Sequence, residues 1–374
     1  MAAGLGRDDG WVVQDVTVIL FDDGLASTAI LPVEIFHTAG ALWAELHGQS
    51  PRPRFRVRTA SLTGAPVRTP YGVTITPETS IDQIDRTDII LVPTSGLDLD
   101  ARLPDNRALL PWLRRHHAAG AYVAGVCMGA AYLAEAGLLD GRIGTTHWAQ
   151  ADQFARRYPN VRWRAELVVT EDARLLCSGG VSAAMDVSLH LVEKLCGHEV
   201  AVQTAKALLM SMPRTHQAGY AVLPLSAPHD DAEVREVEVD LQGRFHLDIS
   251  VEAMAARAGL GERTFVRRFK AATGRSPGAY LRAVRIEAAK SLLEREARSI
   301  QAVSSAVGYD DVAFFRDLFK RATGMTPAEY RQRFGALAVR GFREPEGPAM
   351  EARPAVADLA DERPLDHEVA RLGV

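Results

Sequence analysis

Cysteine is scarce in this sequence, and long apolar runs are missing. The 374 residues include three cysteines, Cys127, Cys177 and Cys196, which are widely spaced and form no CxxC pair. An odd and scattered set argues against a disulfide framework or a cysteine zinc site, and it fits a reducing cytoplasm. No apolar stretch approaches the roughly 20 residues of a membrane-spanning helix, and the first ten residues lack the features of a secretory signal. We therefore expect a cytoplasmic protein with no membrane partner.

The histidines lack the spacing of metal ligands. His116 and His117 are adjacent, so their side chains would diverge on a helix, and the other histidines show no ligand pattern. His216, His229 and His246 fall at or beside a proline-containing stretch, and we expect them to be solvated. The sequence thus predicts neither a metal site nor a cofactor.

The chain is too long for one ordinary domain. Its first half alternates strand-like runs such as Val12–Phe21 and Asp88–Pro93 with helical patterns such as Asn106–Ala119, which predicts an α/β domain with a parallel sheet. The pattern from about Asp230 is helical almost throughout. We expect five segments: an N-terminal tail, 1–10; an α/β domain, 11–212; a linker, 213–229; an all-α domain, 230–334; and a disordered tail, 335–374.

Positive charge is concentrated in one part of the chain. The whole sequence has a formal net charge of −4, but residues 244–334 hold 17 Lys and Arg against 10 Asp and Glu. A basic segment joined to an acidic remainder suggests a polyanion as the partner of that segment alone. Charge by itself does not separate a nucleic-acid surface from an ordinary solvated one.

The basic segment contains an internal repeat with a spacing of 50 residues. The two copies read FVRRFKAATGRSPGAY and FRDLFKRATGMTPAEY, and they begin at Phe265 and Phe315. The agreement of the seven pairs named next, all in one register, indicates a true repeat. The matched pairs are Phe265 and Phe315, Phe269 and Phe319, Lys270 and Lys320, Thr273 and Thr323, Gly274 and Gly324, Pro277 and Pro327, and Tyr280 and Tyr330.

Each copy is typical of a helix-turn-helix unit. In the first, Val251 and Met254 mark the apolar face of a short helix, and Gly259 permits the tight turn before a second helix. Phe265 and Phe269 lie four residues apart on that second helix, so both face the core. The residues predicted to contact DNA lie on the second helix of each copy: Arg263, Thr264, Arg267, Arg268 and Lys270, and then Ala313, Arg316, Lys320 and Arg321.

Signals at the helix ends support these boundaries. Gly308 marks the turn of the second copy, and in both copies the second helix ends at Thr-Gly, a common C-terminal stop. The next helix then begins with a hydroxyl residue followed by proline. Thr326 with Glu329 forms the pattern of a capping box.

One long helix is predicted between the two units, from Pro277 to about Glu296. At 1.5 Å per residue it is about 30 Å long, close to the roughly 34 Å of one turn of B-DNA. Second helices held at its ends would enter successive major grooves on one face of a duplex. A helical protein-interaction domain is the alternative, but its outward faces would be mixed rather than basic. The expected core-facing residues are Tyr280, Leu281, Val284, Ala288 and Leu292.

Residues 245–334 resemble the helix-turn-helix domain of the AraC/XylS family, down to the run AVGYDDVAFFRDLFKRATGMTPAEYRQRF. The resemblance implies a bacterial transcription factor, usually an activator, that binds a double-stranded DNA operator and acts with RNA polymerase. Asp317 stands at the site that matches Arg267, so the second unit should bind phosphate more weakly. The arginines would either read guanine edges or clamp phosphates, and the sequence leaves both readings open.

Cys127 follows the apolar run Ala121–Val126 and precedes a predicted helix opened by Gly129. A cysteine on such a strand-to-helix turn is held in a cramped backbone conformation. A nearby helix N-terminus lowers the pKa of a thiol and attracts anions. His147, in the run TTHW, is placed to approach this thiol. Cys177 and Cys196 have apolar neighbours and are expected in the core.

Residues 11–212 resemble the PfpI/ThiJ branch of the class I glutamine amidotransferase-like superfamily, and more closely the sensor half of GlxA-type transcriptional regulators. The matching pieces are the Cys127 turn, AGLLDG, THW and the run from Ser178-Gly179-Gly180 to Asp186. The resemblance implies a flavodoxin-like parallel sheet, often in a homodimer. It also makes the turn a candidate pocket for a small-molecule effector, formed by Cys127, Met128, Gly129, His147 and Trp148.

The residues do not complete a catalytic relay. Enzymes of this superfamily place a glutamate near the thiol, but the loop Gly24–Ile30 has no acid, and Glu34 comes later in a helical stretch. We therefore expect no enzyme, and an inert thiol in a domain that senses a ligand. The alternative is a hydrolase or hydratase activity that depends on Cys127 and His147. The effector and the operator are not identified by the sequence.

Overall fold

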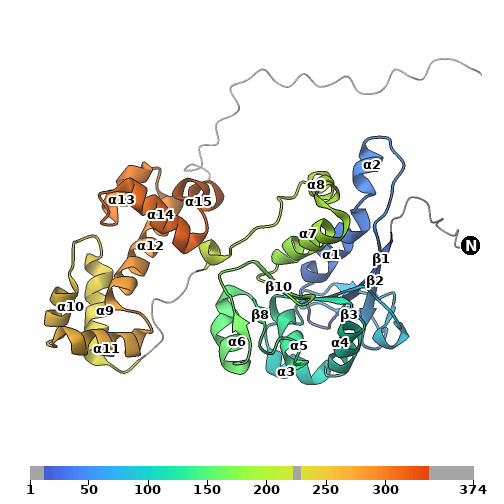
Figure 1. Ribbon diagram of the computed structural model, residues 1–374, viewed down its shortest axis with the longest axis horizontal. Helices are drawn as coiled ribbons and strands as arrows, with labels where there is room; N and C mark the ends of the chain where they lie inside the picture. Colours follow the sequence, from blue (N-terminus) through green and yellow to red (C-terminus); the bar gives the residue numbers. More distant parts are fainter. Residues whose placement is uncertain (1–11, 222–228, 337–374) are drawn as a thin grey trace, which may run out of the picture.

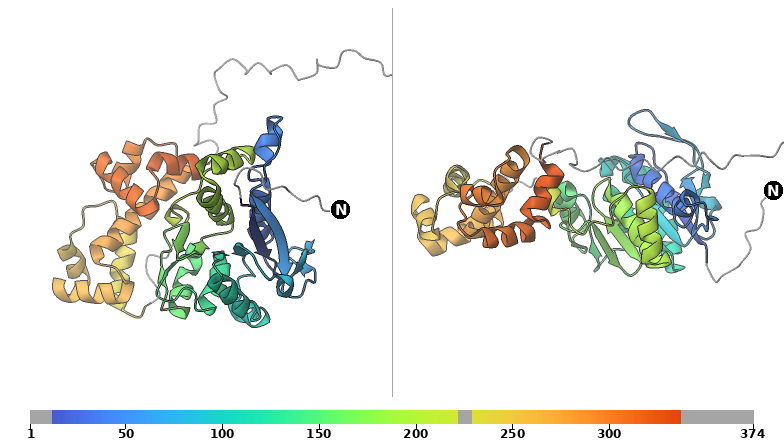
Figure 2. Two further views of the ribbon diagram at one scale, coloured as in Figure 1. Left: turned by 45° about the vertical axis from the view of Figure 1, so that its right-hand side comes forward. Right: turned by 90° about the horizontal axis from the view of Figure 1, so that it is seen from above.

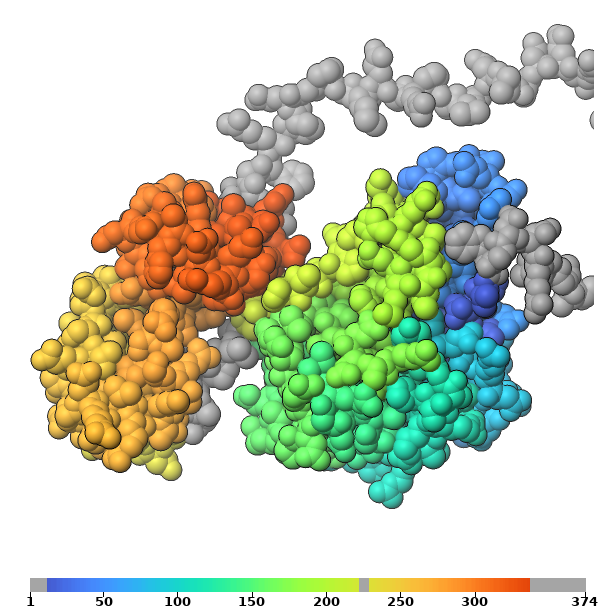
Figure 3. All heavy atoms as spheres, in the orientation of Figure 1, coloured from blue at the N-terminus to red at the C-terminus, as the bar shows by residue number. Residues whose placement is uncertain are grey.

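The computed structural model describes residues 12–221 and 229–336 in two parts, an α/β part and a helical part (Figure 1). A space-filling view shows them as two lobes that meet near the end of the α/β part (Figure 3). The predicted N-terminal tail, 1–10, lies outside the described residues. For the tail predicted over 335–374, only its first two residues are described.

The α/β part is built on one mixed sheet of mostly parallel strands. Five neighbouring pairs of strands are parallel, and β10 alone runs antiparallel to its neighbour β11. The order across the sheet is β10 (Val169–Asp172), β11 (Leu175–Ser178), β7 (Tyr122–Val126), β6 (Ile89–Val92), β1 (Gln14–Ile19), β2 (Phe55–Ser61) and β5 (Thr79–Ser80).

Helices cover both faces of this sheet, which explains why its central strands are continuous apolar runs (Figures 1 and 2). All four residues of β6 are fully buried. One face is covered by α1 (Ser27–Thr38) and α7 (Ala183–Cys196), with α8 (His198–Ala207) packed on α7, and the other by α3 (Leu99–Asp105), α4 (Leu109–Ala118) and α5 (Ala130–Glu135). This arrangement confirms the predicted flavodoxin-like fold class.

The sequence did not reveal the short elements around this core. The antiparallel edge strand β10 was missed because its run VTED has too few apolar residues to stand out. The remaining short elements are α2 (Leu42–Leu46), β3 (Val67–Arg68), β4 (Thr74–Ile75), η1 (Ile81–Gln83), η2 (Cys127–Gly129), β8 (Ile143–Gly144), η3 (Trp148–Gln150), α6 (Ala151–Arg157), β9 (Arg162–Trp163) and η4 (Ala218–Tyr220).

The helical part contains the two predicted helix-turn-helix units. They have separate hydrophobic cores, the first around Phe265 and Phe269 and the second around Phe315 and Phe319. The elements are α9 (Ala232–Arg244), α10 (Val251–Arg257), α11 (Glu262–Thr273), α12 (Pro277–Arg295), α13 (Ile300–Ala306), α14 (Val312–Thr323) and α15 (Pro327–Phe334).

The predicted turn and cap signals are confirmed. Gly274 and Gly324 end α11 and α14 in the left-handed conformation, with φ of 73° and 76°. Gly259 and Gly308, at the turns of the two units, also have positive φ. The capping box of Thr326 is formed in full. These positions favour glycine because a side chain strains a left-handed backbone.

The long helix α12 is confirmed, but part of its predicted buried face is wrong. Ala288 and Leu292 are only partly buried, whereas Ile286, Ala289 and Leu293 are buried. The reason is that α12 serves two cores. Its first half packs on the first core and its second half on the other, so the buried stripe changes side along the helix.

The predicted linker is structured in its first part. Residues 213–221 pack against both parts of the protein, and residues 222–228 lie outside the described ranges. His229 is not solvated as expected, because its side chain is 12% exposed and its Nε2 lies 2.7 Å from an oxygen of Glu238. The expectation failed because α9 begins immediately afterwards and covers the ring.

Candidate nucleic-acid interface and the cysteine turn

The outer face of α11 carries cationic side chains that have no partner among the residues the structure describes. Arg263, Thr264, Arg267 and Lys270 are exposed on the side away from the buried phenylalanines, as the sequence predicted. Within residues 12–221 and 229–336, none of the three cationic side chains forms a hydrogen bond or ion pair. Exposed cations without an ion-pair partner can bind a polyanion without first breaking an internal contact.

Arg268 is placed differently from its neighbours. Its guanidinium donates hydrogen bonds to Asp231 at 2.8 and 2.9 Å and to Glu233 at 2.8 Å. The hydrogen bond to Asp231 is the main cause that raises the pKa of Arg268 and lowers that of Asp231. Arg268 is thus bound to the start of α9, and the geometry does not support its predicted place among the DNA contacts.

The outer face of α14 has a different chemistry. Asp311 caps its N-terminus by accepting hydrogen bonds from the backbone N–H groups of Ala313 and Phe314, at 2.8 and 3.1 Å. The predicted residues of this helix are exposed, and so are two further side chains, one aromatic and one acidic. The predicted set is Ala313, Arg316, Lys320 and Arg321, and the further two are Phe314 and Asp317.

Arg285 fixes the two units to one another, a role that sequence reasoning missed. It projects from the middle of α12 and donates hydrogen bonds to the carbonyls of Phe245 and Leu247 in the first unit and Gly308 in the second, at 2.8 to 3.1 Å. Its guanidinium also lies 4.9 Å from the ring centroid of Tyr309. No spacing in the sequence marks such a contact.

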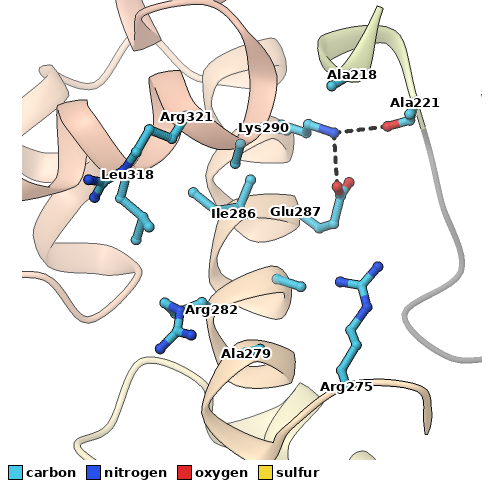
Figure 4. Close-up of a pocket in the computed structure, with 12 residues that line it drawn as sticks. Ala218, Ala221, Arg275, Ala279, Arg282, Ile286, Glu287, Lys290, Leu318 and Arg321 are labelled. Atoms are coloured by element: carbon cyan, nitrogen blue, oxygen red, sulfur yellow. Dashed lines mark hydrogen bonds and ion pairs between the residues drawn. The ribbon is translucent and has the colours of Figure 1, made fainter. Parts of the chain in front are cut away.

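A pocket of about 360 Å³ lies between α12 and α14 (Figure 4). Its lining combines apolar side chains such as Ile286 and Leu318 with the cations Arg282 and Arg321. The buried Lys290 donates hydrogen bonds to the carbonyl of Ala221 at 2.9 Å and to Glu287 at 2.8 Å. Lys290 therefore ties α12 to the segment that arrives from the α/β part.

That segment, residues 214–221, is held by the α/β part on one side. Arg214 pairs with Asp186 of α7 at 2.5 Å. The buried amide of Gln217 donates hydrogen bonds to the carbonyls of Thr146 and Leu167, at 2.8 and 3.0 Å. The segment therefore packs as part of the α/β domain.

The same segment is held by the second unit on its other side. Arg333 donates a hydrogen bond to the hydroxyl of Tyr220 at 3.0 Å, and the rings of Tyr220 and Phe334 pack at 5.0 Å. A Cβ on Gly219 would lie 2.1 Å from the terminal methyl of Met325 and 3.1 Å from the carbonyl oxygen of Thr323, so a larger residue here would require the Met325 side chain to move. The second unit is thus packed against the chain that leaves the α/β part.

Cys127 occupies the predicted sharp turn, with φ of 55°. Its side chain is buried, at 2% exposure. Burial raises the pKa of the thiol, and this outweighs the opposing hydrogen bonds with Thr94 and with the backbone of Met128 and His147. The expectation that the helix start lowers this pKa is therefore wrong. Burial likewise raises the pKa of Cys177 to about 12.

The other residues of the candidate ligand pocket differ in burial. Met128 and Gly129 are buried, and the Nδ1 of His147 accepts a hydrogen bond from the backbone of the next turn at 3.1 Å. Burial lowers the pKa of His147. Trp148 is partly exposed, as is His147. Of the five predicted pocket residues, three are therefore buried and two, His147 and Trp148, are partly exposed.

No described acid completes a relay at this turn. Glu34 is exposed on α1. Within the described ranges, no carboxylate bonds to Cys127 or His147, and no group of three or more His, Cys, Asp or Glu side chains could hold a metal ion. None of the helices described there has the length and apolar character needed to span a bilayer.

Two family models match the chain. The model described as the DJ-1/PfpI family matches residues 16–194. The model described as a helix-turn-helix domain matches residues 254–333. These matched ranges correspond to the sheet domain and to the two repeated units.

The proteins to which this chain is similar include transcriptional regulators and an enzyme. The HTH-type transcriptional regulator CdhR of Pseudomonas aeruginosa is 26% identical over 279 residues, which is 74% of this chain and 82% of that protein. The HTH-type transcriptional regulator GlxA of Rhizobium meliloti is 28% identical over 235 residues, 62% of this chain and 72% of the relative. An isonitrile hydratase of Pseudomonas putida is 33% identical over 138 residues, 36% of this chain and 58% of the enzyme.

The similarity to the two regulators extends over most of both chains, whereas the similarity to the enzyme is confined to little more than a third of this one. The predicted resemblance to GlxA-type regulators is thereby confirmed. The chain consists of a DJ-1/PfpI domain followed by an AraC-type helix-turn-helix domain.

Proposed function

We propose that this protein is a transcriptional regulator that binds a specific site in double-stranded DNA. The observation that carries the proposal is the pair of exposed helices α11 and α14, held at opposite ends of α12. The 19 residues of α12 span about 28 Å. This length is close to one helical turn of B-DNA, so the two helices would enter successive major grooves.

The charges on these helices support a nucleic-acid partner. Arg263 and Arg267 are exposed and unpaired within the described residues, although Asp and Glu side chains are plentiful elsewhere. Such cations would release condensed counterions from phosphates or read guanine edges. The relatives named as HTH-type transcriptional regulators support the same assignment. The family resemblance adds activation through RNA polymerase and a homodimer to the proposal.

The DJ-1/PfpI domain is proposed to sense a small molecule and not to catalyse a reaction. The buried thiol of Cys127 with its raised pKa supports an inert cysteine. A ligand at this turn would contact His147 and Trp148 first, because these two side chains are partly exposed whereas Cys127 is buried. Thr146 links the turn to Gln217, since its hydroxyl donates a hydrogen bond to the Cys127 carbonyl at 3.0 Å and its own carbonyl accepts one from Gln217.

Residues 214–221 would then carry the change to the second helix-turn-helix unit. An effector acts in this way only if it binds the two arrangements with different affinity. The test is binding of the full chain to its selected DNA site with and without candidate metabolites. Equal DNA affinity in every case would remove the sensing role.

DNA binding itself is tested by selecting a site from a random duplex library with the full chain. We expect Arg267→Ala to weaken binding to the selected site by about 5- to 150-fold if the arginine reads a base, or to make the salt dependence shallower by about one ion if it contacts phosphate. Arg268→Ala is the matched control, because this neighbouring arginine is held by Asp231. Failure to select any duplex would overturn the proposal.

A further inference from the structure

The most outward position of each recognition helix differs between the two units. Arg267 lies two residues from both Phe265 and Phe269, so at 100° per residue it points almost directly away from the core. Asp317 has the same relation to Phe315 and Phe319. The position that would enter the groove deepest is therefore cationic in α11 and acidic in α14.

The 50-residue register extends this contrast to the preceding turn. Arg263 corresponds to Ala313, and Thr264 corresponds to Phe314. All four side chains are exposed, and the large ring of Phe314 is 49% exposed although its neighbours on this face are small or charged. The outward surface of α11 is thus basic and hydrogen-bonding, whereas the central part of the α14 surface is acidic and apolar.

The acid at this position in α14 has no cationic partner in the part of the chain that the structure describes. Asp317 is exposed and makes no ion pair with any residue in the described ranges. Facing DNA it is repelled by phosphates, so only a hydrogen-bond donor on a base edge would hold it there. In the major groove the donors are the amino groups of cytosine and adenine, and carboxylates are suited to cytosine N4.

We propose that the two units read different bases: α11 reads guanine through Arg263 and Arg267, and α14 reads cytosine through Asp317. Phe314 lies beside Asp317 on the same face and contacts the methyl group of a thymine next to that cytosine. Arg316 and Lys320 flank them and bind phosphates. The DNA site is therefore asymmetric, with a guanine-containing half and a cytosine-thymine half on the strand that is read.

This inference rests on the proposed DNA binding, and the test separates the two. The full chain and the variants Asp317→Arg, Asp317→Asn and Arg267→Ala are each used to select duplexes from one random library. Arg267→Ala, the matched change in α11, identifies the half-site read by that helix, because guanine preference is lost there alone. Asp317→Arg is expected to change one cytosine to guanine in the other half-site and to leave the first half unchanged.

The expected size of the switch is about 5- to 150-fold in relative affinity for the two sites, and Asp317→Asn should weaken the cytosine preference. Thermal unfolding checks that each variant is folded, which is expected because Asp317 is exposed and unpaired. If the wild-type chain selects a site but the Asp317 variants select the same bases, the cytosine assignment is overturned and DNA binding stands. If the wild-type chain selects no sequence, the proposed function itself fails.

Discussion

The two parts of this molecule differ in how they expose the side chains with the most distinctive chemistry. In the DJ-1/PfpI domain, Cys127 sits at a strained turn but is closed off from solvent, and burial raises the pKa of its thiol. In the helix-turn-helix domain, Arg263 and Arg267 stand in solvent with no partner in the described chain. The comparison teaches that the candidate nucleophile of the first domain is covered by its own fold, whereas the cations of the second domain are accessible to a partner.

The strongest test of this division is a core substitution in one part only. Phe269→Ala removes a fully buried ring from the first helix-turn-helix core, and we expect a loss of about 3 to 5 kcal/mol in the unfolding free energy of that domain. The sheet domain should unfold at its usual denaturant concentration, since its core is separate. Urea unfolding followed by far-UV circular dichroism would show two transitions, and a single shifted transition would contradict the division.

A smaller effect is expected from the brace between the two units. Arg285→Ala leaves the carbonyls of Phe245, Leu247 and Gly308 without their charged donor. We expect a loss of about 2 to 3 kcal/mol in unfolding free energy and weaker DNA binding, because the two recognition helices lose their fixed separation. Arg282→Ala on the same helix is the control, since this side chain is exposed. Equal stability of the two variants would show that the brace does not matter.

The next prediction concerns the buried thiol. Because its pKa is raised, Cys127 holds less thiolate at neutral pH than a free cysteine, and its sulfur is also covered. Alkylation by iodoacetamide should be at least about tenfold slower in the folded protein than after denaturation, as measured by mass spectrometry of the peptide that contains Cys127. Rapid alkylation near pH 7 would instead favour the hydrolase or hydratase alternative.

The smallest effect is expected at the Asp231–Arg268 pair. The pair lowers the pKa of Asp231, so its contribution to stability is present above the unfolded-state value of about 3.9 and is lost as pH falls through the lower folded value. The difference in urea midpoint between wild type and Arg268→Ala should therefore shrink between pH 6 and pH 2.5. It should be small throughout, because both side chains remain partly accessible to solvent, which screens the pair. A difference that grows in acid would have the wrong sign.

The sequence predicted the elements whose signal is periodic and local. The sheet strands around Ile89–Val92, the repeated units and the caps at Gly274 and Gly324 all follow from spacing alone. The edge strand β10 and the full buried face of α12 were missed. A helix that serves two cores has no single stripe, so no one period describes it.

The candidate site was predictable in its exposed face but not in its internal contacts. Exposure of Arg267 follows from its place between two phenylalanines. The hydrogen bonds from Arg268 to Asp231 and from Arg285 to Phe245 and Leu247 join residues 37 to 40 positions apart in the chain. Such pairings depend on how the helices pack, and the local pattern of charges does not predict them. The same holds for Gln217, whose partners Thr146 and Leu167 lie 71 and 50 positions earlier in the chain.

The clamp formed by Arg285 has a consequence for the promoters that this protein would regulate. Because α11 and α14 are both fixed to α12, the distance between them and their relative orientation are constant. Inserting a single base pair between the two half-sites would rotate one of them by about 35° relative to the other and move it by about 3.4 Å. Promoters under its control should therefore tolerate base substitutions between the half-sites far better than insertions or deletions there. Among such promoters, the spacing between the half-sites should vary less than the bases within it.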